Sequence, residues 1–271
     1  MSKRTLAHLA ILGLLALYML PIAWMLSTSL KPDDELFTEQ IRWIPNRIAW
    51  ENYQQALATF PFGLYLRNTV LIAGLTVVGA LLSCLPPAYA FARLRWRGRN
   101  FWFWVMLSTL MLPPQVTLLP VFLLFRQLGW VDTFLPLIVP AFLGNAFLIF
   151  MLRQFFLTLP QELIDAARLD GCSEWAILWR LVAPMSKPAV ATVALFSFVW
   201  AWTDFMNPLI YLNDSSKFTL AVGLQYFLGR HGEQWNLLMA AATVVTAPLV
   251  LLFLLTQRAY VRGITLTGLK G

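Results

Sequence analysis

Long runs without a charged side chain constrain the fold of this chain more than any other feature. A helix needs about 20 apolar residues to cross the hydrocarbon core of a bilayer. One such run, 189–212, is interrupted only by Asp204. Lys, Arg, Asp and Glu are entirely absent from residues 5–30, 68–92, 100–125, 133–152 and 234–257. The sequence therefore predicts an all-α integral membrane protein with six transmembrane helices.

The six predicted helices form a single transmembrane domain over residues 1–271. We place the spans approximately at 5–30, 68–92, 100–125, 133–152, 189–212 and 236–258. The composition agrees, because 59% of the residues are hydrophobic and 12% are charged, whereas soluble domains have about half and a quarter. The first run exceeds the roughly 7–15 apolar residues of a secretory signal, so we expect it to remain as a span.

The basic residues predict the orientation of the chain in the membrane. Of the 20 Lys and Arg residues, thirteen fall on the same side as the N-terminus and seven on the other. Because basic residues are in excess on the cytoplasmic side, we expect both termini in the cytoplasm. The loop 157–187 is then cytoplasmic, and the loops 31–67 and 213–235 lie outside.

The net charge of +7 does not indicate a nucleic-acid partner. A nucleic-acid binder gathers its basic residues on one soluble face, whereas here they lie between apolar runs. The densest cluster, from Arg93 to Arg99, stands on a very short predicted loop. We interpret it as a topological anchor that contacts anionic lipid headgroups.

Motifs of catalysis are absent from the sequence. It contains no GxxxxGK[ST] loop for phosphates, no HExxH pair for zinc and no GxSxG nucleophile turn. His8 and His231 are far apart, and we interpret both as interfacial residues. We therefore expect this chain to be no enzyme, with no catalytic residues, no bound metal and no cofactor of its own.

The cytoplasmic loop carries the signals of two short helices. Thr158 and Gln161 have the spacing of a capping box, and Gly171 is placed to end the first helix. Ser173 is then the cap of a second helix, which we expect Pro184 to stop. By helical spacing Gln161, Glu162, Asp165 and Arg168 share one side, and Leu163, Ala166 and Ala167 another. These features fit equally a surface that docks another protein and a helix that packs on its own membrane domain.

The same loop resembles the "EAA" loop of ABC importer permeases. Residues 159–171 read LPQELIDAARLDG, with Asp165-Ala166-Ala167 in place of Glu-Ala-Ala and Gly171 four positions after the second Ala. The family's later Leu-Pro is Ala183-Pro184 here, a second departure. The resemblance implies a coupling helix that sits in a cleft of an ATPase subunit. The coupling residues it implies are Glu162, Asp165, Ala166, Ala167, Arg168, Asp170 and Gly171.

The resemblance extends over most of the chain from residue 31 onward and is closest to the carbohydrate-uptake branch, of the maltose-permease type. It implies the type I ABC importer permease fold in a bacterial inner membrane. The implied partners are a second homologous permease, two cytoplasmic ATP-binding subunits that bind ATP and Mg²⁺, and an extracytoplasmic solute-binding protein. We expect that protein to dock on 213–233 and 31–67. The implied cargo is a sugar or oligosaccharide, with glycerol phosphate or a polyol as the alternative.

An acidic residue inside the fifth predicted span is the candidate for the translocation path. A mid-membrane Asp costs about 2.5–3.5 kcal/mol on insertion scales, so Asp204 is expected to face protein or water. It either lines the path, together with Trp202 and Asn207, or ties two helices together. An ion-coupled secondary transporter is the alternative from another class, but such proteins place several ionisable groups near the midplane.

Overall fold

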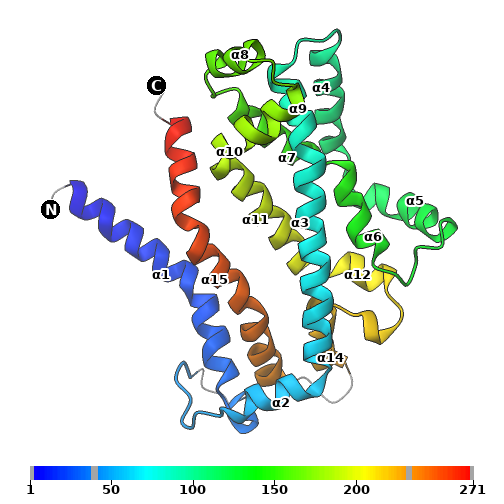
Figure 1. Cartoon of the computed structure of the whole chain (residues 1–271). Helices are drawn as coiled ribbons and strands as arrows, with labels where there is room; N and C mark the ends of the chain where they lie inside the picture. The colour runs from blue at the N-terminus through cyan, green and yellow to red at the C-terminus, as the bar shows by residue number, and fades with distance from the viewer. Residues whose placement is uncertain (1–2, 38–41, 230–233, 269–271) are drawn as a thin grey trace. The chain divides into compact units, whose positions relative to one another are not determined.

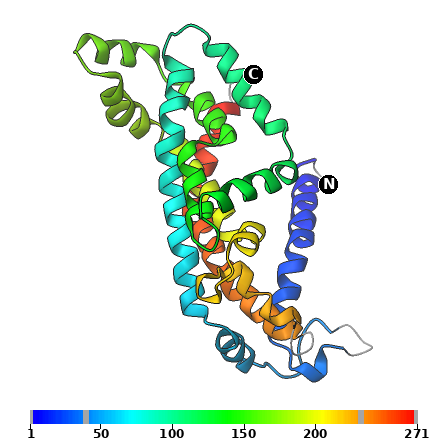
Figure 2. The ribbon, with the colours of Figure 1, turned by 90° about the vertical axis from the view of Figure 1, so that its right-hand side faces the viewer.

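The structure is a computed structural model that describes residues 3–37, 42–229 and 234–268. For Lys3, Leu6 and residues 257–268 it describes the backbone alone. Every regular element in these ranges is an α-, 3₁₀- or π-helix, as Figures 1 and 2 show. The predicted all-helical fold class is therefore confirmed over the described part of the chain.

Contacts group the helices into two compact units, which are described separately here. Unit 1 comprises residues 1–65 and 220–251, and unit 2 comprises residues 66–219 and 252–271. Two helices belong to both units, α3 (Phe62–Arg93) and α15 (Trp235–Gly268). Each begins in unit 1 and continues into unit 2. The single transmembrane domain of residues 1–271 stays a prediction.

Unit 1 is organised around buried amide groups. Its remaining elements are α1 (Lys3–Ser29), η1 (Asp33–Glu35), α2 (Glu51–Thr59), α13 (Leu220–Gly223) and α14 (Tyr226–Gly229). The Asn52 side-chain amide donates to the carbonyls of Ser29 (3.0 Å) and Lys31 (2.8 Å). Asn236 donates to the same Lys31 carbonyl at 3.4 Å. These bonds satisfy the polar groups where α1 ends, which burial would otherwise leave without partners.

Unit 2 holds the remaining helices of the chain. In chain order they are α4 (Arg99–Ser108), η2 (Thr109–Met111), α5 (Pro114–Gln127), α6 (Leu135–Ile138), η3 (Val139–Leu143), α7 (Ala146–Phe156), α8 (Gln161–Leu169), α9 (Glu174–Ala176), the π-helix η4 (Ile177–Val182), α10 (Ala183–Met185), α11 (Lys187–Thr203), α12 (Met206–Tyr211) and η5 (Ser215–Lys217). Its core joins α3, α7, η4 and α11, with Ala88, Leu152, Val182 and Val193 fully buried. Small side chains such as Ala88 let the helices approach closely, as membrane helix interfaces require.

Four helical stretches of the described chain are long and apolar enough to cross a membrane. They are Ala7–Ser29, Phe62–Arg93, Leu135–Phe156 and Trp235–Thr256. Two further pairs of helices are long and apolar enough only when the two members are taken together, and each pair is bent at a short break. The pairs are Arg99–Met111 with Pro114–Gln127, and Glu174–Met185 with Lys187–Thr203. The number of spans reaches six when each bent pair counts as one. The exact span and loop boundaries stay predictions.

Three of the predicted spans contain breaks. The run 133–152 is interrupted at Gly144 and Asn145, between η3 and α7. The run 100–125 bends by 96° at Leu112 and Pro113, because a residue before proline is disfavoured in the helical region; Leu112 is extended, with ψ 117°. The run 189–212 is not one helix either. The helix α11 ends at Thr203, Asp204 has an extended backbone, and α12 starts at Met206.

Candidate functional site

The helix α8 carries most of the predicted site residues. The helix begins at Gln161. Pro160, with a φ of −61° and an extended ψ, holds the capping position, and no side chain makes a capping hydrogen bond there. The predicted capping box is wrong, because the Thr158 hydroxyl donates to the Phe155 carbonyl at 2.7 Å. Thr158 stands two residues before the true capping position and cannot take that role.

The C-terminal end of α8 is a Schellman motif, as the glycine predicted. Gly171 has a φ of +78°, a conformation that glycine adopts without strain. Its N–H donates to the Arg168 carbonyl (3.0 Å), and the Cys172 N–H donates to the Ala167 carbonyl (3.0 Å). These are the two bonds that define the motif, so the predicted cap is confirmed. Gly129, with φ +69°, closes α5 by the same pair of bonds.

Arg93, the last residue of α3, holds the start of α8. One guanidinium nitrogen donates to the Gln161 side-chain oxygen at 2.7 Å. The other donates to the backbone carbonyls of Phe156 and Leu159. The planar guanidinium suits such divergent acceptors better than a lysine ammonium. The end of α3 and the start of α8 are thus joined through one side chain.

A charged cluster ties the middle of α8 to α9 and α3. Arg168 pairs with Asp165 at 3.0 Å and with Glu174 at 2.8 Å. The Tyr89 hydroxyl of α3 donates to the other Glu174 oxygen at 2.5 Å. Partial burial opposes ionisation of Glu174, but the bonds from Arg168 and Tyr89 outweigh it and lower its pKa. The same bond to Glu174 raises the pKa of Arg168.

The two sides of α8 have different surroundings. Ile164 is 1% exposed and Ala167 packs against the core of unit 2. On another side, Gln161 and Arg168 both donate to the same side-chain oxygen of Asp165. The rest of the helix surface, which we call the outward face, is exposed: Glu162, Leu163, Ala166, Leu169 and Asp170. Leu169 reaches 90% exposure.

The second helix of the loop starts as predicted and ends differently. The Ser173 side chain accepts from the Ala176 N–H at 3.3 Å, which confirms the cap. The predicted stop at Pro184 is wrong, since the helix passes through a π-helical segment and ends at Met185. Pro184 lies in the first turn of α10, where its missing N–H is tolerated. The bend of 86° comes after Met185.

Asp204 stands at the break between α11 and α12. It accepts from the backbone N–H of Asn207 (3.1 Å) and from its side-chain amide (2.8 Å), so its carboxylate is bonded to the first turn of α12, whose capping position is Phe205. It also lines a cavity of about 150 Å³ with Thr76, Trp200 and Ala201 among its neighbours. Trp202 is 3% exposed and stacks on Phe198 at 5.2 Å. The structure brings Asp204 and Asn207 together but not Trp202.

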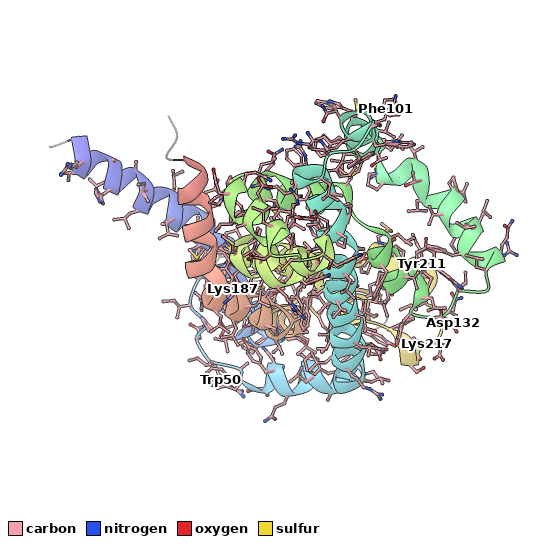
Figure 3. The ribbon with its side chains drawn as sticks, turned by 45° about the horizontal axis from the view of Figure 1, so that its top comes forward. Trp50, Phe101, Asp132, Lys187, Tyr211 and Lys217 are labelled. Atoms are coloured by element: carbon pink, nitrogen blue, oxygen red, sulfur yellow. The ribbon has the colours of Figure 1, made fainter. Side chains whose placement is uncertain are left out.

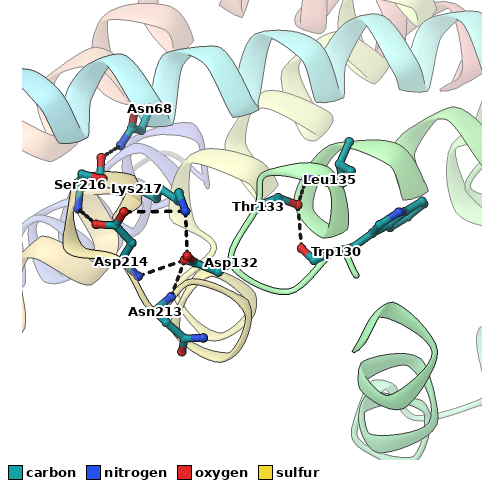
Figure 4. Close-up of polar contacts among 9 residues, drawn as sticks. All are labelled: Asn68, Trp130, Asp132, Thr133, Leu135, Asn213, Asp214, Ser216 and Lys217. Atoms are coloured by element: carbon teal, nitrogen blue, oxygen red, sulfur yellow. Dashed lines mark hydrogen bonds and ion pairs between the residues drawn. The ribbon is translucent and has the colours of Figure 1, made fainter. Parts of the chain in front are cut away.

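A polar cluster that the sequence did not indicate, which we call the Asp132 cluster, joins the loop before α6 to the loop after α12 (Figure 4). Asp132 accepts from the Lys217 ammonium at 2.7 Å and from the backbone N–H groups of Asn213 and Asp214. Its own N–H donates to the Tyr211 carbonyl at 2.7 Å, and Figure 3 labels Asp132, Tyr211 and Lys217 in this region. The only sequence signal is a tolerance of aspartate for the left-handed backbone seen at Asp132, φ 62°.

Replacing Asp132 by Asn tests the Asp132 cluster. Asn keeps the backbone conformation and one acceptor oxygen but removes the charge that faces Lys217. The Lys217 bond, followed by the two N–H bonds, lowers the pKa of Asp132 from 3.8 to about 2. The wild-type carboxylate thus stabilises the cluster above pH 3.8, and that contribution is lost as the pH falls toward 2. We expect several-fold faster hydrogen exchange at Asn213 and Asp214 in the variant at neutral pH.

In the wild type, protection of these amides against hydrogen exchange is expected to fall as the pH is lowered from 3.8 to about 2. The variant has no carboxylate to protonate in this range, so its protection is expected to stay unchanged. Hydrogen exchange of the full chain in lipid nanodiscs measures both effects. Asp34→Asn removes an exposed carboxylate elsewhere and serves as the matched control. Equal protection in the wild type and in Asp132→Asn would show that the ion pair does not hold these loops.

A metal site is not formed in the described ranges, where no three His, Cys, Asp or Glu residues lie close enough together to hold an ion. The polar groups of α8 are instead used in bonds to the same chain or are exposed. This arrangement leaves the outward face free to bind a protein surface.

Comparison with protein-family models gives one match over most of the chain. Residues 76–266 match the family described as binding-protein-dependent transport system inner membrane component. The matched region includes α8, the break at Asp204 and the Asp132 cluster.

Curated relatives match over nearly the whole chain. An arabinooligosaccharides transport system permease protein of Halalkalibacterium halodurans is 34% identical over 93% of this chain and 91% of its own length. An sn-glycerol-3-phosphate transport system permease protein of Yersinia pestis is 32% identical over 93% of this chain and 91% of its own length.

A solved structure has a similar fold. It is a bacterial ABC transporter involved in the import of the acidic polysaccharide alginate, with a TM-score of 0.83. The alignment covers 95% of this chain and 98% of the other, at 24% sequence identity. An identity this low shows the fold alone, and that fold is of the ABC importer permease type.

Proposed function

Because the chain belongs to the family of binding-protein-dependent transport system inner membrane components, we propose that α8 is the coupling helix through which partner ATPases drive import. The observation that carries this proposal is the division of α8 into two sides. One side is bonded to α3 and α9 of the same chain. The outward face, which includes Leu169, is exposed and available to another subunit.

The proposed mechanism is a shift between two populations of the transporter. Closure of the ATPases on ATP moves α8, and the bonds of Arg93 and Arg168 pass the movement to α3 and α9. The pore then changes from inward-facing to outward-facing. Such coupling requires that the ATPase binds the two states with different affinity, and contacts made by the outward face supply that difference.

The proposed partners follow from the role of α8. Two ATP-binding subunits, which bind ATP and Mg²⁺ and carry out the hydrolysis, lie on the cytoplasmic side with both termini of this chain. A second homologous permease completes the pore, and a solute-binding protein docks on the outer loops 31–67 and 213–233. The excess of basic residues on the side of the N-terminus supports this orientation.

The proposed cargo is a sugar or an oligosaccharide, carried past Asp204 and Asn207. The permease for arabinooligosaccharides, at 34% identity, supports this class. The permease for sn-glycerol-3-phosphate, at 32% identity, supports glycerol phosphate as the second candidate. Calorimetric titration of the cognate solute-binding protein with both classes distinguishes them, because only the true cargo binds tightly.

A glycine pair in the chain tests the coupling role of α8. Gly171→Val places a branched side chain at φ +78°, where L-residues are strained by about 1–2 kcal/mol. The end of α8 is expected to shift, and ATP hydrolysis stimulated by the loaded binding protein is expected to fall about tenfold. The reconstituted transporter in nanodiscs is the system to measure.

Gly129→Val is the matched control, because Gly129 has φ +69°, the same cap motif and equally open space for a side chain. It closes α5 and is expected to leave stimulated hydrolysis nearly unchanged. Assembly of both variants is checked by size-exclusion chromatography. An undiminished stimulation in Gly171→Val, or an equal loss in both variants, contradicts the coupling role.

A further inference from the structure

A large basic cavity lies beside the loop that joins α3 to α4. Its volume is about 1010 Å³. Four arginines are among the residues that line it, Arg93, Arg95, Arg99 and Arg168, together with Asp165 and Glu174. The cavity lies within unit 2 and uses the side of α8 that is turned away from the outward face.

The positive charge of this cavity is only partly neutralised. Arg168 pairs with both carboxylates. In the part of the chain that the structure describes, no carboxylate lies within 4 Å of the guanidinium groups of Arg93, Arg95 or Arg99. Arg99 donates to the Leu94 carbonyl at 3.1 Å, and Arg93 donates to neutral oxygens. Three cations around one cavity favour a bound anion, and guanidinium groups suit phosphate oxygens.

An apolar cavity of about 340 Å³ adjoins the basic one. It shares Ala90, Leu94 and Glu174 with the basic cavity and is otherwise lined by apolar and aromatic residues: Pro86, Pro87, Tyr89, Trp175 and Leu178. A free phosphate ion would occupy the basic cavity and make no use of this second one. A molecule with an anionic group joined to a hydrocarbon chain fits both.

Aromatic residues place the two cavities at the level of the membrane surface. Phe101, Trp102 and Trp104, at the start of α4, are 65%, 55% and 68% exposed, and Figure 3 labels Phe101 beside the loop. Exposed Trp side chains of membrane proteins gather at the interface between lipid and water. Basic pockets on the cytoplasmic side of membrane helices are sites for anionic lipid headgroups.

The geometry points to a specific binding site for an anionic phospholipid of the cytoplasmic leaflet. Its phosphate lies among Arg93, Arg95 and Arg99, and one acyl chain lies against Leu94 and Trp175. This goes beyond a general attraction of basic residues to the membrane, because it assigns one lipid to one cavity. The site is separate from the outward face of α8, so lipid and ATPase bind different surfaces.

Two arginines of the same short loop allow a matched test. Arg95 lines the cavity and Arg97 does not, while both side chains are exposed. The wild-type transporter, Arg95→Gln and Arg97→Gln are placed in nanodiscs of phosphatidylcholine with a small fraction of phosphatidylglycerol. Native mass spectrometry then counts the lipids that stay bound. One basic residue near the surface contributes about 1 kcal/mol, or about fivefold in affinity.

The expected result is bound phosphatidylglycerol on the wild type and on Arg97→Gln, reduced about fivefold on Arg95→Gln, with little phosphatidylcholine on any of them. Arg95→Lys is expected to restore part of the binding. Equal retention by the two Gln variants, or equal retention of both lipids, overturns the site. Displacement of the lipid by millimolar inorganic phosphate also overturns it, because it would show an anion site that does not use the acyl chain.

Discussion

Replacing Leu169 by Glu is expected to reduce ATP hydrolysis stimulated by the loaded binding protein by about thirtyfold or more. Leu169 is 90% exposed at the end of α8, so the substitution changes folding stability by about 0.5 kcal/mol or less. At a protein interface, loss of a central anchor costs about 2 kcal/mol or more, which is about thirtyfold in affinity. A carboxylate buried in an apolar cleft adds to this cost.

The measurement for Leu169→Glu is binding of the ATPase subunits to the permease pair, followed by hydrolysis at saturating ATP. Leu128→Glu is the control, since Leu128 is 51% exposed at the end of the other glycine-capped helix, α5. The control is expected to bind the ATPases normally. If both variants keep normal binding, the outward face of α8 is not the docking surface.

Replacing Arg93 by Met is expected to release the start of α8 from α3. The backbone carbonyls of Phe156 and Leu159 lose the guanidinium donor, although the Phe156 carbonyl keeps the N–H of Leu159 at 3.2 Å. A buried acceptor that loses its partner costs about 1–3 kcal/mol, and part-buried acceptors such as these lie toward the lower end of that range. The Gln161 side chain loses its bond as well. We expect faster hydrogen exchange along α8 and more than a tenfold loss of stimulated ATP hydrolysis, with ATPase binding largely retained.

Two further variants separate this loss from simple removal of a charge. Arg97→Met removes an exposed cation of the same loop and is expected to leave α8 unchanged. Arg93→Lys keeps the charge but cannot reach three divergent acceptors, so it is expected to behave more like Met than like Arg. Unchanged exchange along α8 in Arg93→Met would mean that α3 does not hold the helix.

The difference in outcome between these two experiments distinguishes docking from transmission. Leu169→Glu acts on the proposed docking surface, so it is expected to weaken assembly. Arg93→Met acts on the bonds within the chain, so the partner still binds but its movement no longer reaches α3. Binding and stimulated hydrolysis therefore fall together in the first variant and separate in the second.

Local features of this fold were predictable from the sequence. The charge-free runs indicated the long helices, and Gly171 and Ser173 indicated caps whose bonds are local. The capping box failed for a local reason as well. Pro160 adopts an extended backbone and itself becomes the capping position, so Thr158 lies too far from the helix to cap it.

Contacts between distant residues were not predictable in this way. Arg93 is 68 residues from Gln161, and Asp132 is 85 residues from Lys217. No helical spacing or turn signal connects such pairs, because they meet only when separate helices pack. The break at Asp204 was missed for a different reason. The bond that marks it joins residues only three apart, Asp204 and Asn207, but the apolar run around it suggested one continuous helix.

The division of α8 into a bonded side and an exposed side has a consequence for building transporters. The groups that hold the helix on its own chain, Arg93 and Arg168, are different from the outward residues such as Leu163, Ala166 and Leu169. If α8 docks an ATPase subunit as proposed, recognition of that subunit is modular. Grafting the outward residues of a relative onto this helix is then a route to orthogonal pairs of permease and ATPase. Two such transporters could operate in one cell without exchanging ATPase subunits.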